Sequence, residues 1–483
     1  MFLSKKKKSS TKVFDNLKNL DPRCAGIDVG ADSIFVCALD SFGKQEVREF
    51  TVFTKDLQSM SDWLEERDVE SVAMESTGVY WIPIFEILEQ NGFEVLLVNA
   101  FHLKCVPGRK TDVKDSQWIQ QLHSNGLLQG SFRPIDAYVR LRGLVRQRAE
   151  LYKEGARKIQ HMHKSLTQMN IQLRIAVSDI TGKTGLTIIQ EIIKGERDPV
   201  KLASFRDRRC KKTLPEIKKA LEGNWRDEHI FVLRQSYETY EFFHKQIAEC
   251  EEQIKQILDT LPSPEINLEL EAKGQKFTSP KDLFDAFTPQ TNQLPIKKKK
   301  TKKKKCSYDR SPYYFDAGFA LERICGINVT ELPGIEGNIA MTILSEVGTD
   351  MSKWKNKKYF SSWLGLCPGN KVSGGKILSS RTRRSDNRAA QAFRLAANAV
   401  RNTDTAIGAY YRRMRSKFGP AKAITATAHK LAVIFYTMLK FKVSYKELGA
   451  EYYEKKYKEK LLINLKNKAK AMGYQITPLD MIA

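Results

Sequence analysis

Apolar and amphipathic segments follow one another between residues 22 and 135, and their order limits the fold of this region more than any other feature. Short apolar segments rich in β-branched residues predict strands at 25–30, 33–40, 46–53, 71–77 and 93–100. Segments with apolar residues at helical spacing predict helices at 54–68, 79–92 and 112–126, and the last two end at Asn-Gly, which is typical of left-handed helix ends. An antiparallel meander of three strands, followed by alternating helices and strands, predicts an α/β layer fold.

Four acidic residues occupy the ends of these expected elements. Asp28 lies in the first strand, Glu75 ends a later strand, and Asp112 and Asp115 are three apart where a helix begins, so both face the same way. Carboxylates at the ends of apolar strands are costly unless a cation neutralises them. Hard cations such as Mg²⁺ prefer oxygen ligands, and a pair of them can hold the attacking and leaving oxygens of a phosphoryl transfer. The order of these acids favours a metal site of the kind that a ribonuclease-H-like nuclease needs.

Each acid also has an ordinary structural interpretation. Asp28 can be a turn residue, Glu75 can be the partner of a helix N-cap, and the other two acids suit the dipole of a first helical turn. Taken singly, each acid is more readily explained as structural. Only their combination, in this order and on these elements, favours metal binding.

The charge balance points to a polyanionic partner. The 483 residues carry 81 Lys and Arg against 56 Asp and Glu, a net charge of +25. Nucleic acid is therefore the first choice of partner, and an anionic membrane surface is the second. No apolar run approaches the about 20 residues that span a bilayer, and residues 1–21 form a basic arm without the apolar core of a secretory signal. None of the eight cysteines forms a C-x-x-C pair, so buried thiols in a reducing cytoplasm are expected rather than zinc ligands.

Two long amphipathic segments dominate residues 136–262. Their apolar faces can pack against each other as a hairpin within one chain, or against a second subunit as a dimerising coiled coil. Residues 263–320 are expected to be a linker or insertion, and they contain the lysine runs 297–300 and 302–305. So dense a block of like charges is expected to be disordered when free. It either holds a nucleic-acid backbone by counterion release or is a solvated loop.

A further domain is expected at 321–450, followed by a basic helical tail at 451–483. Gly334 and Gly337 lie in LPGIEGNIAM, which is similar to the turn of a helix-hairpin-helix element that presents backbone N–H groups to a phosphate. Ser373 precedes two glycines in an expected flexible turn. The candidate phosphate-binding cations follow it: Lys376, Arg381, Arg383, Arg384 and Arg388. Because arginines stabilise charge on phosphate oxygens under attack by a hydroxyl, Ser373 is either a nucleophile or a hydrogen-bonding residue of a phosphate-binding loop.

The chain resembles the DEDD transposases of bacterial insertion sequences, the family numbered one hundred and ten. The first block of the resemblance is IDVG, MESTGVYW and GRKTDVKDS, which contains the four acids in the order of the family. The second block is LPGIEGNIAMTILSEVG, YFSSWLGLCPGNKVSGGK and RRSDNRAA. Within it, Asp386 and Asn387 depart from the basic, glycine-containing segment that is usual at this place, and the lysine-rich insertion is also unusual.

The resemblance implies a RuvC-like N-terminal domain with the ribonuclease-H fold at 22–135, a helical coiled-coil middle at 136–262 and a mostly α-helical C-terminal transposase domain. By position, the four acids would hold Mg²⁺ or Mn²⁺, and Ser373 would be the nucleophile, with Ser379, Ser380 and Ser385 as nearby competitors. It also implies a covalent 5′-phosphoserine intermediate and an active site shared between subunits of a dimer or tetramer. A noncoding bridge RNA would pair with donor and target DNA in the bacterial cytoplasm, at the nucleoid and away from membranes.

Three other functions are compatible with parts of the sequence. A RuvC-like, structure-specific nuclease would use only the acids and a metal-bound water, and would form no covalent adduct. A non-catalytic nucleic-acid-binding protein would use only the basic surface. An actin-like ATPase also opens with a segment like IDVG, but no later Gly-Gly motif for adenosine is found in a second α/β domain.

Overall fold

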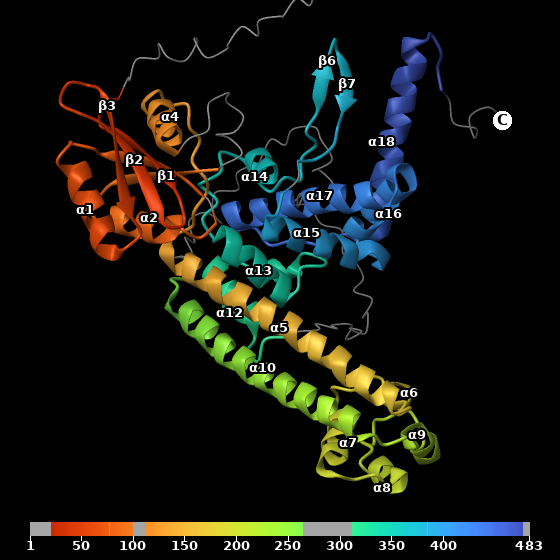
Figure 1. The fold of residues 1–483 in the computed structure, drawn as a ribbon. Coiled ribbons are helices and arrows are strands. Elements are labelled where there is room, and N and C mark those ends of the chain that lie inside the picture. Colours follow the sequence, from red (N-terminus) through yellow and green to blue (C-terminus); the bar gives the residue numbers. More distant parts are fainter. Residues whose placement is uncertain (1–20, 77, 100–111, 264–311, 384, 477–483) are drawn as a thin grey trace, which may run out of the picture. The chain divides into compact units, whose positions relative to one another are not determined.

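The computed structural model describes residues 21–76, 78–99, 112–263, 312–383 and 385–476, and it places the backbone but not the side chains of 112–114 (Figure 1). The expected basic arm up to residue 20, both lysine runs and Arg384 lie outside these residues. The chain divides into two compact units, 1–133 and 134–483, which are treated separately below. Within the described residues, no helix is both long enough and apolar enough to cross a membrane.

The first unit is built on a five-stranded mixed sheet with the strand order β3-β2-β1-β4-β5. Its strands are β1 (Cys24–Val29), β2 (Ser33–Leu39), β3 (Gln45–Thr51), β4 (Ser71–Glu75) and β5 (Glu94–Val98). The first three strands pair antiparallel, while β4 pairs parallel to β1 and β5 pairs parallel to β4. The predicted meander and the five predicted strands are thereby confirmed.

Helices cover both faces of this sheet. Alternate residues of β1 (Ala25, Ile27 and Val29) face the core that the sheet forms with α1 (Thr54–Glu65) and α2 (Trp81–Gln90). The opposite face packs against α4 (Asp112–Ser124), which contributes Ile119 and Leu122 to a smaller core with Ala73 and Val98. Gly92 and Gly126 follow α2 and α4 with φ of 89° and 64°, which confirms the predicted left-handed helix ends.

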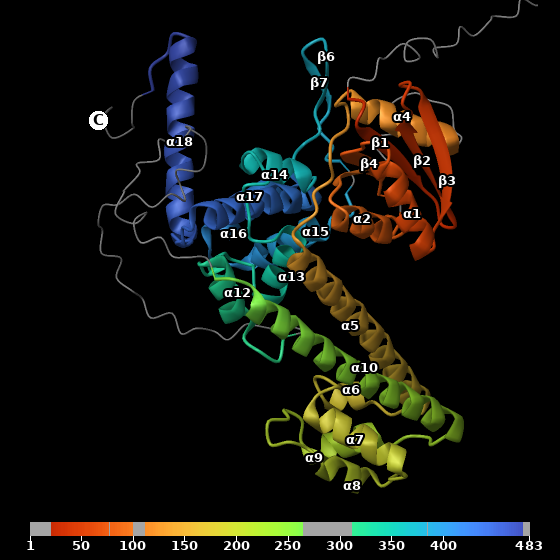
Figure 2. The ribbon, with the colours of Figure 1, turned by 90° about the vertical axis from the view of Figure 1, so that its left-hand side faces the viewer.

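The second unit begins with two long helices that pack antiparallel, α5 (Asp136–Gln168) and α10 (Asp227–Thr260) (Figures 1 and 2). Their buried residues recur at helical spacing, so each apolar face is covered by the other helix. Four short helices close one end of this hairpin: α6 (Leu173–Ala176), α7 (Lys183–Lys194), α8 (Pro199–Ser204) and α9 (Leu214–Leu221). The intramolecular hairpin is therefore the observed arrangement, while the dimeric coiled coil stays a prediction.

The remainder of the second unit is mostly helical. Its elements are α12 (Ala317–Cys325), η3 (Val329–Glu331), α13 (Gly337–Val347), α14 (Lys357–Trp363), β6 (Lys371–Ser373), β7 (Lys376–Ser379), α15 (Arg388–Ala399), η4 (Val400–Asn402), α16 (Ala406–Phe418), α17 (Pro420–Phe441) and α18 (Gly449–Ala471). The α17 helix runs through the core, where Phe435 meets Phe393 of α15 and Tyr436 meets Phe360 of α14. On α5, Arg146 forms two 2.8 Å hydrogen bonds with the buried carboxylate of Glu346 at the end of α13. This contact joins the hairpin to the C-terminal helices.

Candidate functional site

Asp28 and Glu75 are brought together by the register of two neighbouring strands. Ile27 of β1 pairs with Met74 of β4, and these strands are parallel, so the next residue of each lies at the same edge of the sheet. Both acidic side chains are half-buried. Glu75 pairs with Val98, the last residue of β5, and Asn99 follows Val98 at the same edge of the sheet. The sequence interpretation missed Asn99, although an amide directly after a parallel strand is the signal that could have found it.

The α4 helix lies so close to β1 that only glycine fits between them. A Cβ atom added to Gly26 would lie 2.2 Å from the backbone nitrogen of Gln120 and 2.5 Å from the carbonyl oxygen of Ser116. Asp28 is two residues further along the strand, so it lies on the same face as Gly26, toward α4. On β4, Ala73 packs against α4, and Glu75 is two residues further along the strand, so it also faces α4.

Contacts at the other end of α4 determine the direction in which the helix runs. The Ser124 hydroxyl donates to the Asp21 carbonyl at 2.9 Å, before β1 begins. The His123 Nε2 lies 2.9 Å from the Ser71 hydroxyl at the start of β4. Burial lowers the pKa of His123, and the burial of the Cys24 thiol beside Gln120 raises the pKa of that thiol to about 11. The last turn of α4 is thus held at the starting ends of β1 and β4, and its first turn lies toward the ends that carry Asp28 and Glu75.

This arrangement places the start of α4, with Asp112 and the half-buried Asp115, at the acidic edge of the sheet. The Asp112 side chain lies outside the described residues. Among the side chains that the structure does describe, no group of three or more His, Cys, Asp or Glu is arranged to hold a metal ion. The elements converge as the metal hypothesis requires, while the ligand set itself stays a prediction.

Ser373 ends β6, directly before the turn at Gly374 and Gly375 that the sequence predicted, and this turn closes a β-hairpin. It pairs with Lys376 across the β6–β7 hairpin, and the two central residues, Gly374 and Gly375, have φ of 54° and 75°. Positive φ at both positions is the signature of a tight type I′ turn, which only glycine and a few polar residues adopt readily. The hairpin stands out from the surrounding helices, and Ser373 is exposed (Figures 1 and 2).

Two of the competing serines have local structural partners. The Ser379 hydroxyl accepts a hydrogen bond from the Arg381 backbone nitrogen, and the Ser385 hydroxyl accepts one from Asn387, each at 3.3 Å. No hydrogen bond of the Ser373 hydroxyl is found among the described residues, which leaves this side chain accessible to a substrate. Its role as nucleophile stays a prediction, as do those of Ser379, Ser380 and Ser385.

The predicted phosphate-binding residues have mixed surroundings. Lys376, Arg381 and Arg383 are exposed. Arg388 instead begins α15, where its Nη2 lies 3.4 Å from Glu150 of α5. Asn387 caps α15 by accepting a hydrogen bond from the Ala390 nitrogen, so the unusual asparagine has a local structural use.

Gly334 and Gly337 lie in the turn before α13. Gly334 has φ of 82°, and a Cβ atom there would lie 2.6 Å from the Ala396 carbonyl of α15. This close packing explains the glycine without any ligand. Gly337 is the first residue of α13, as expected for the second half of a helix-hairpin-helix turn. Phosphate binding by this turn stays a prediction.

Two family models match the chain, one over the sheet and the start of the hairpin and the other over the C-terminal helices. A model described as Transposase, that of the DEDD transposases of IS110, matches residues 25–171 and includes all four acids. A second, described as Transposase IS116/IS110/IS902 family, matches residues 327–412 and includes Ser373. No curated protein matches the chain.

Both matches are to transposases, so the chain is an enzyme that acts on DNA. The chain belongs to the IS110 family of DEDD transposases. Its substrate is therefore DNA, in agreement with the net charge of +25.

Proposed function

We propose that this transposase cuts and rejoins DNA strands through Ser373, assisted by Mg²⁺ or Mn²⁺ held by Asp28, Glu75, Asp112 and Asp115. The observation that carries the proposal is the pairing of Ile27 with Met74, which aligns two of the acids on one face of the sheet. The contact of Gly26 with α4 supports it, because it brings the helix with the other two acids to that face. We further propose that the mixed sheet is a ribonuclease-H-like, RuvC-like domain.

The donor set consists of carboxylate oxygens, which suit a hard divalent cation. Such a cation would supply charge stabilisation to the phosphate oxygens in the transition state. The acids would bind and orient it, and the half-buried positions of Asp28, Glu75 and Asp115 would restrict their rotation. Exposed Arg381 and Arg383 would neutralise further phosphate charge through bidentate hydrogen bonds.

In the proposed cleavage, the Ser373 hydroxyl oxygen attacks the scissile phosphorus and releases its proton. A bond forms between this oxygen and the phosphorus, and the bond to the 3′-oxygen breaks. The leaving 3′-oxygen takes up a proton, so a 5′-phosphoserine and a 3′-hydroxyl result with no net change in protons or oxidation state. Rejoining is the reverse reaction, in which an exchanged 3′-hydroxyl attacks the phosphoserine and Ser373 leaves.

The proposal includes a noncoding guide RNA that pairs with donor and target DNA, and assembly of the chain into a dimer or tetramer. The resemblance of both motif blocks supports these partners, and the net charge of +25 suits a chain that holds two nucleic acids. Sequence specificity would then reside mainly in base pairing, as in other guided enzymes.

A covalent adduct tests the serine directly. The protein, its RNA and end-labelled donor DNA are incubated with Mg²⁺, and the products are separated on a denaturing gel. We expect a protein–DNA adduct with the parent protein and none with Ser373→Ala. An adduct that persists in Ser373→Ala but disappears in Ser379→Ala, Ser380→Ala or Ser385→Ala reassigns the nucleophile. Cleavage without any adduct instead identifies a metal-dependent nuclease.

The acids are tested by a matched pair of isosteric variants. We expect Asp28→Asn to lower the strand-cleavage rate at least 100-fold at every Mg²⁺ concentration, because it removes a ligand charge. Asp62→Asn changes an exposed carboxylate on α1 that accepts a hydrogen bond from Gln58, and should leave the rate unchanged. Full cleavage by Asp28→Asn would show that the acidic edge does not bind the catalytic metal.

A further inference from the structure

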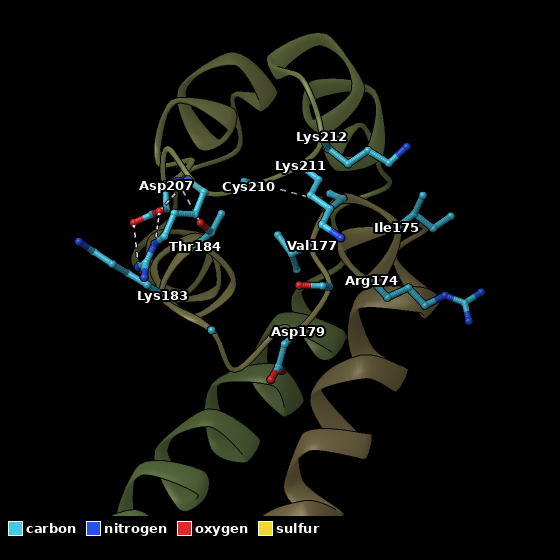
Figure 3. A pocket seen from close by; sticks show the side chains of 14 residues that line it. Arg174, Ile175, Val177, Asp179, Lys183, Thr184, Asp207, Cys210, Lys211 and Lys212 are labelled. Atoms are coloured by element: carbon cyan, nitrogen blue, oxygen red, sulfur yellow. Dashed lines mark hydrogen bonds and ion pairs between the residues drawn. The ribbon is translucent and has the colours of Figure 1, made fainter. Parts of the chain in front are cut away.

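The closed end of the α5–α10 hairpin contains a pocket of about 390 Å³ that neither family match includes. It lies between the segment that leads from α6 into α7 and the loop that leads from α8 to α9 (Figure 3). Its cationic lining residues are Arg174, Lys183, Arg209, Lys211 and Lys212, and all five are exposed. In Figure 3, Lys211 extends into the pocket, whereas Arg174, Lys183 and Lys212 extend outward from its rim.

The two acids of the pocket are engaged in local contacts. Asp179 accepts hydrogen bonds from the backbone and the hydroxyl of Thr181 at 2.9 Å and 2.7 Å. Asp207 accepts a 3.0 Å hydrogen bond from Arg209, which together with the backbone of Arg209 lowers the pKa of Asp207 to about 2. Arg174, Lys183 and Lys211 form no ion pair with any of the described residues. The pocket therefore contains three cations that form no ion pair with its two acids.

The turn that enters the pocket repeats the pattern of the turn before α13. VSDITG at 177–182 parallels LPGIEG at 332–337, and LTIIQE at 186–191 parallels MTILSE at 341–346, with the same interval between the two parts. The matching residues are buried alike, since Val177 and Leu332 are 7% and 0% exposed, and Ile180 and Ile335 are 2% and 1% exposed. The two segments are thus alike in sequence and burial, although the first turn closes from Gly182 to Asp179 and the second from Ile335 to Leu332. Only the second segment lies within a family match.

The start of α7 lines the pocket with Gly182, Lys183 and Thr184. Gly182 is its N-cap and provides no side-chain cap, and no acidic residue occupies the first turn. The first backbone N–H groups of a helix have no partner within it and carry partial positive charge, which suits an anion. Gly185 must be glycine, because a Cβ atom there would lie 2.3 Å from the Ile180 carbonyl oxygen. This tight turn holds the Ile180 carbonyl against the first turn of α7, where Thr184 and Gly185 are buried and Lys183 is exposed.

We propose that this pocket is a second DNA-binding site, which holds backbone phosphates of duplex DNA without reading its sequence. Cations and backbone N–H groups bind phosphates and carry no base specificity. Residues 169–226 contain thirteen Lys and Arg against seven Asp and Glu, so the pocket lies within a basic segment. Arg148 of α5 contacts Asn338 of the C-terminal helix α13 at 3.3 Å, and the site lies at least 20 residues further along α5, which is about 30 Å at the rise of a helix. It would hold DNA well away from Ser373, and it does not depend on the serine mechanism.

The test compares two triple variants of the full-length protein. The pocket variant is Arg174→Ala, Lys183→Ala and Lys211→Ala. The control variant is Lys194→Ala, Lys218→Ala and Lys219→Ala, which removes the same charge from exposed positions of α7 and α9 outside the pocket. Binding to a 30-base-pair duplex of arbitrary sequence is measured by fluorescence anisotropy over a range of salt. The buffer contains EDTA, so the result is independent of whether Ser373 and the acids perform the chemistry.

We expect the pocket variant to bind duplex at least tenfold more weakly near 150 mM salt, and the salt slope to fall by about 3, one unit for each lost phosphate contact. The control variant should bind within about twofold of the parent. Equal losses in both variants, or no loss in the pocket variant, would overturn the proposal. A loss confined to an RNA hairpin of equal length, with duplex binding intact, would overturn the assignment to DNA. Because all the substituted residues are exposed, both variants should melt at the temperature of the parent, and a melting shift in the pocket variant alone calls for single substitutions at Arg174 and Lys211.

Discussion

The buried ion pair between Arg148 and Glu251 gives a sharp test of what holds the second unit together. The side chains are 3% and 4% exposed, and the Arg148 Nε donates to Glu251 at 2.6 Å. Arg148 also contacts the carbonyl of Pro312, and Glu251 accepts a 2.9 Å hydrogen bond from the Tyr314 nitrogen. The pair therefore connects α5, α10 and the segment that leads into α12.

We expect Glu251→Ala to lower the free energy of unfolding of the second unit by about 3–5 kcal/mol, because Arg148 is left charged in a dry site. The Tyr152 and Tyr313 rings, 4.6 Å and 3.7 Å from the guanidinium carbon, favour the lower end of this range. The double variant Arg148→Met with Glu251→Leu should lose less than the single variant, because no buried charge remains.

Urea denaturation followed by far-UV circular dichroism measures these differences. The matched control is Glu154→Ala on α5, the helix of Arg148; the 3.0 Å pair of Glu154 with Arg157 has side chains that are 41% and 71% exposed. Its loss should be about 0–1 kcal/mol because solvent screens the pair. The reasoning fails if Glu251→Ala costs no more than Glu154→Ala, or if the double variant is as unstable as the single one.

Two further predictions concern the α4 contact in the first unit. Gly26→Ala should destabilise this unit by about 1–3 kcal/mol and weaken Mg²⁺-dependent cleavage, because the added Cβ would lie 2.2 Å from the α4 backbone. The control is Gly143→Ala on α5, an exposed position with nothing within 4 Å of the added Cβ, which should stabilise its helix slightly. Equal unfolding midpoints for the two variants would contradict the packing argument. Burial lowers the pKa of His123 below 6.5, so between the folded and unfolded values the unfolded state binds more protons, and stability should fall as pH drops below 6.5. Urea midpoints measured between pH 7.5 and 5 should show a weaker pH dependence in His123→Asn, and an unchanged dependence would exclude this group as its source.

The sequence alone determined which segments form strands and helices in the first unit. The alternation in β1 and β2 and the Asn-Gly ends of α2 and α4 depend on near neighbours in the chain, so they can be read directly from residue order. The same local pattern placed Asp28 and Glu75 at strand ends, and the motif resemblance was confirmed by both family matches. The β6–β7 hairpin was missed because its strands of three and four residues are almost fully exposed and have no apolar alternation.

Only the tertiary structure decided which side chains meet. Sequence periodicity showed that α5 and α10 each have an apolar face. Two such faces can pair within a chain or between chains, and in the structure they pack against each other within one chain. The position of the acids of α4 depends on Gly26, where a missing side chain lets the helix approach a strand about 90 residues away in sequence. The pocket likewise joins Arg174, Lys183 and Lys211 from separate short segments. Local patterns reflect interactions between sequence neighbours, whereas these contacts depend on how surfaces far apart in the chain fit together.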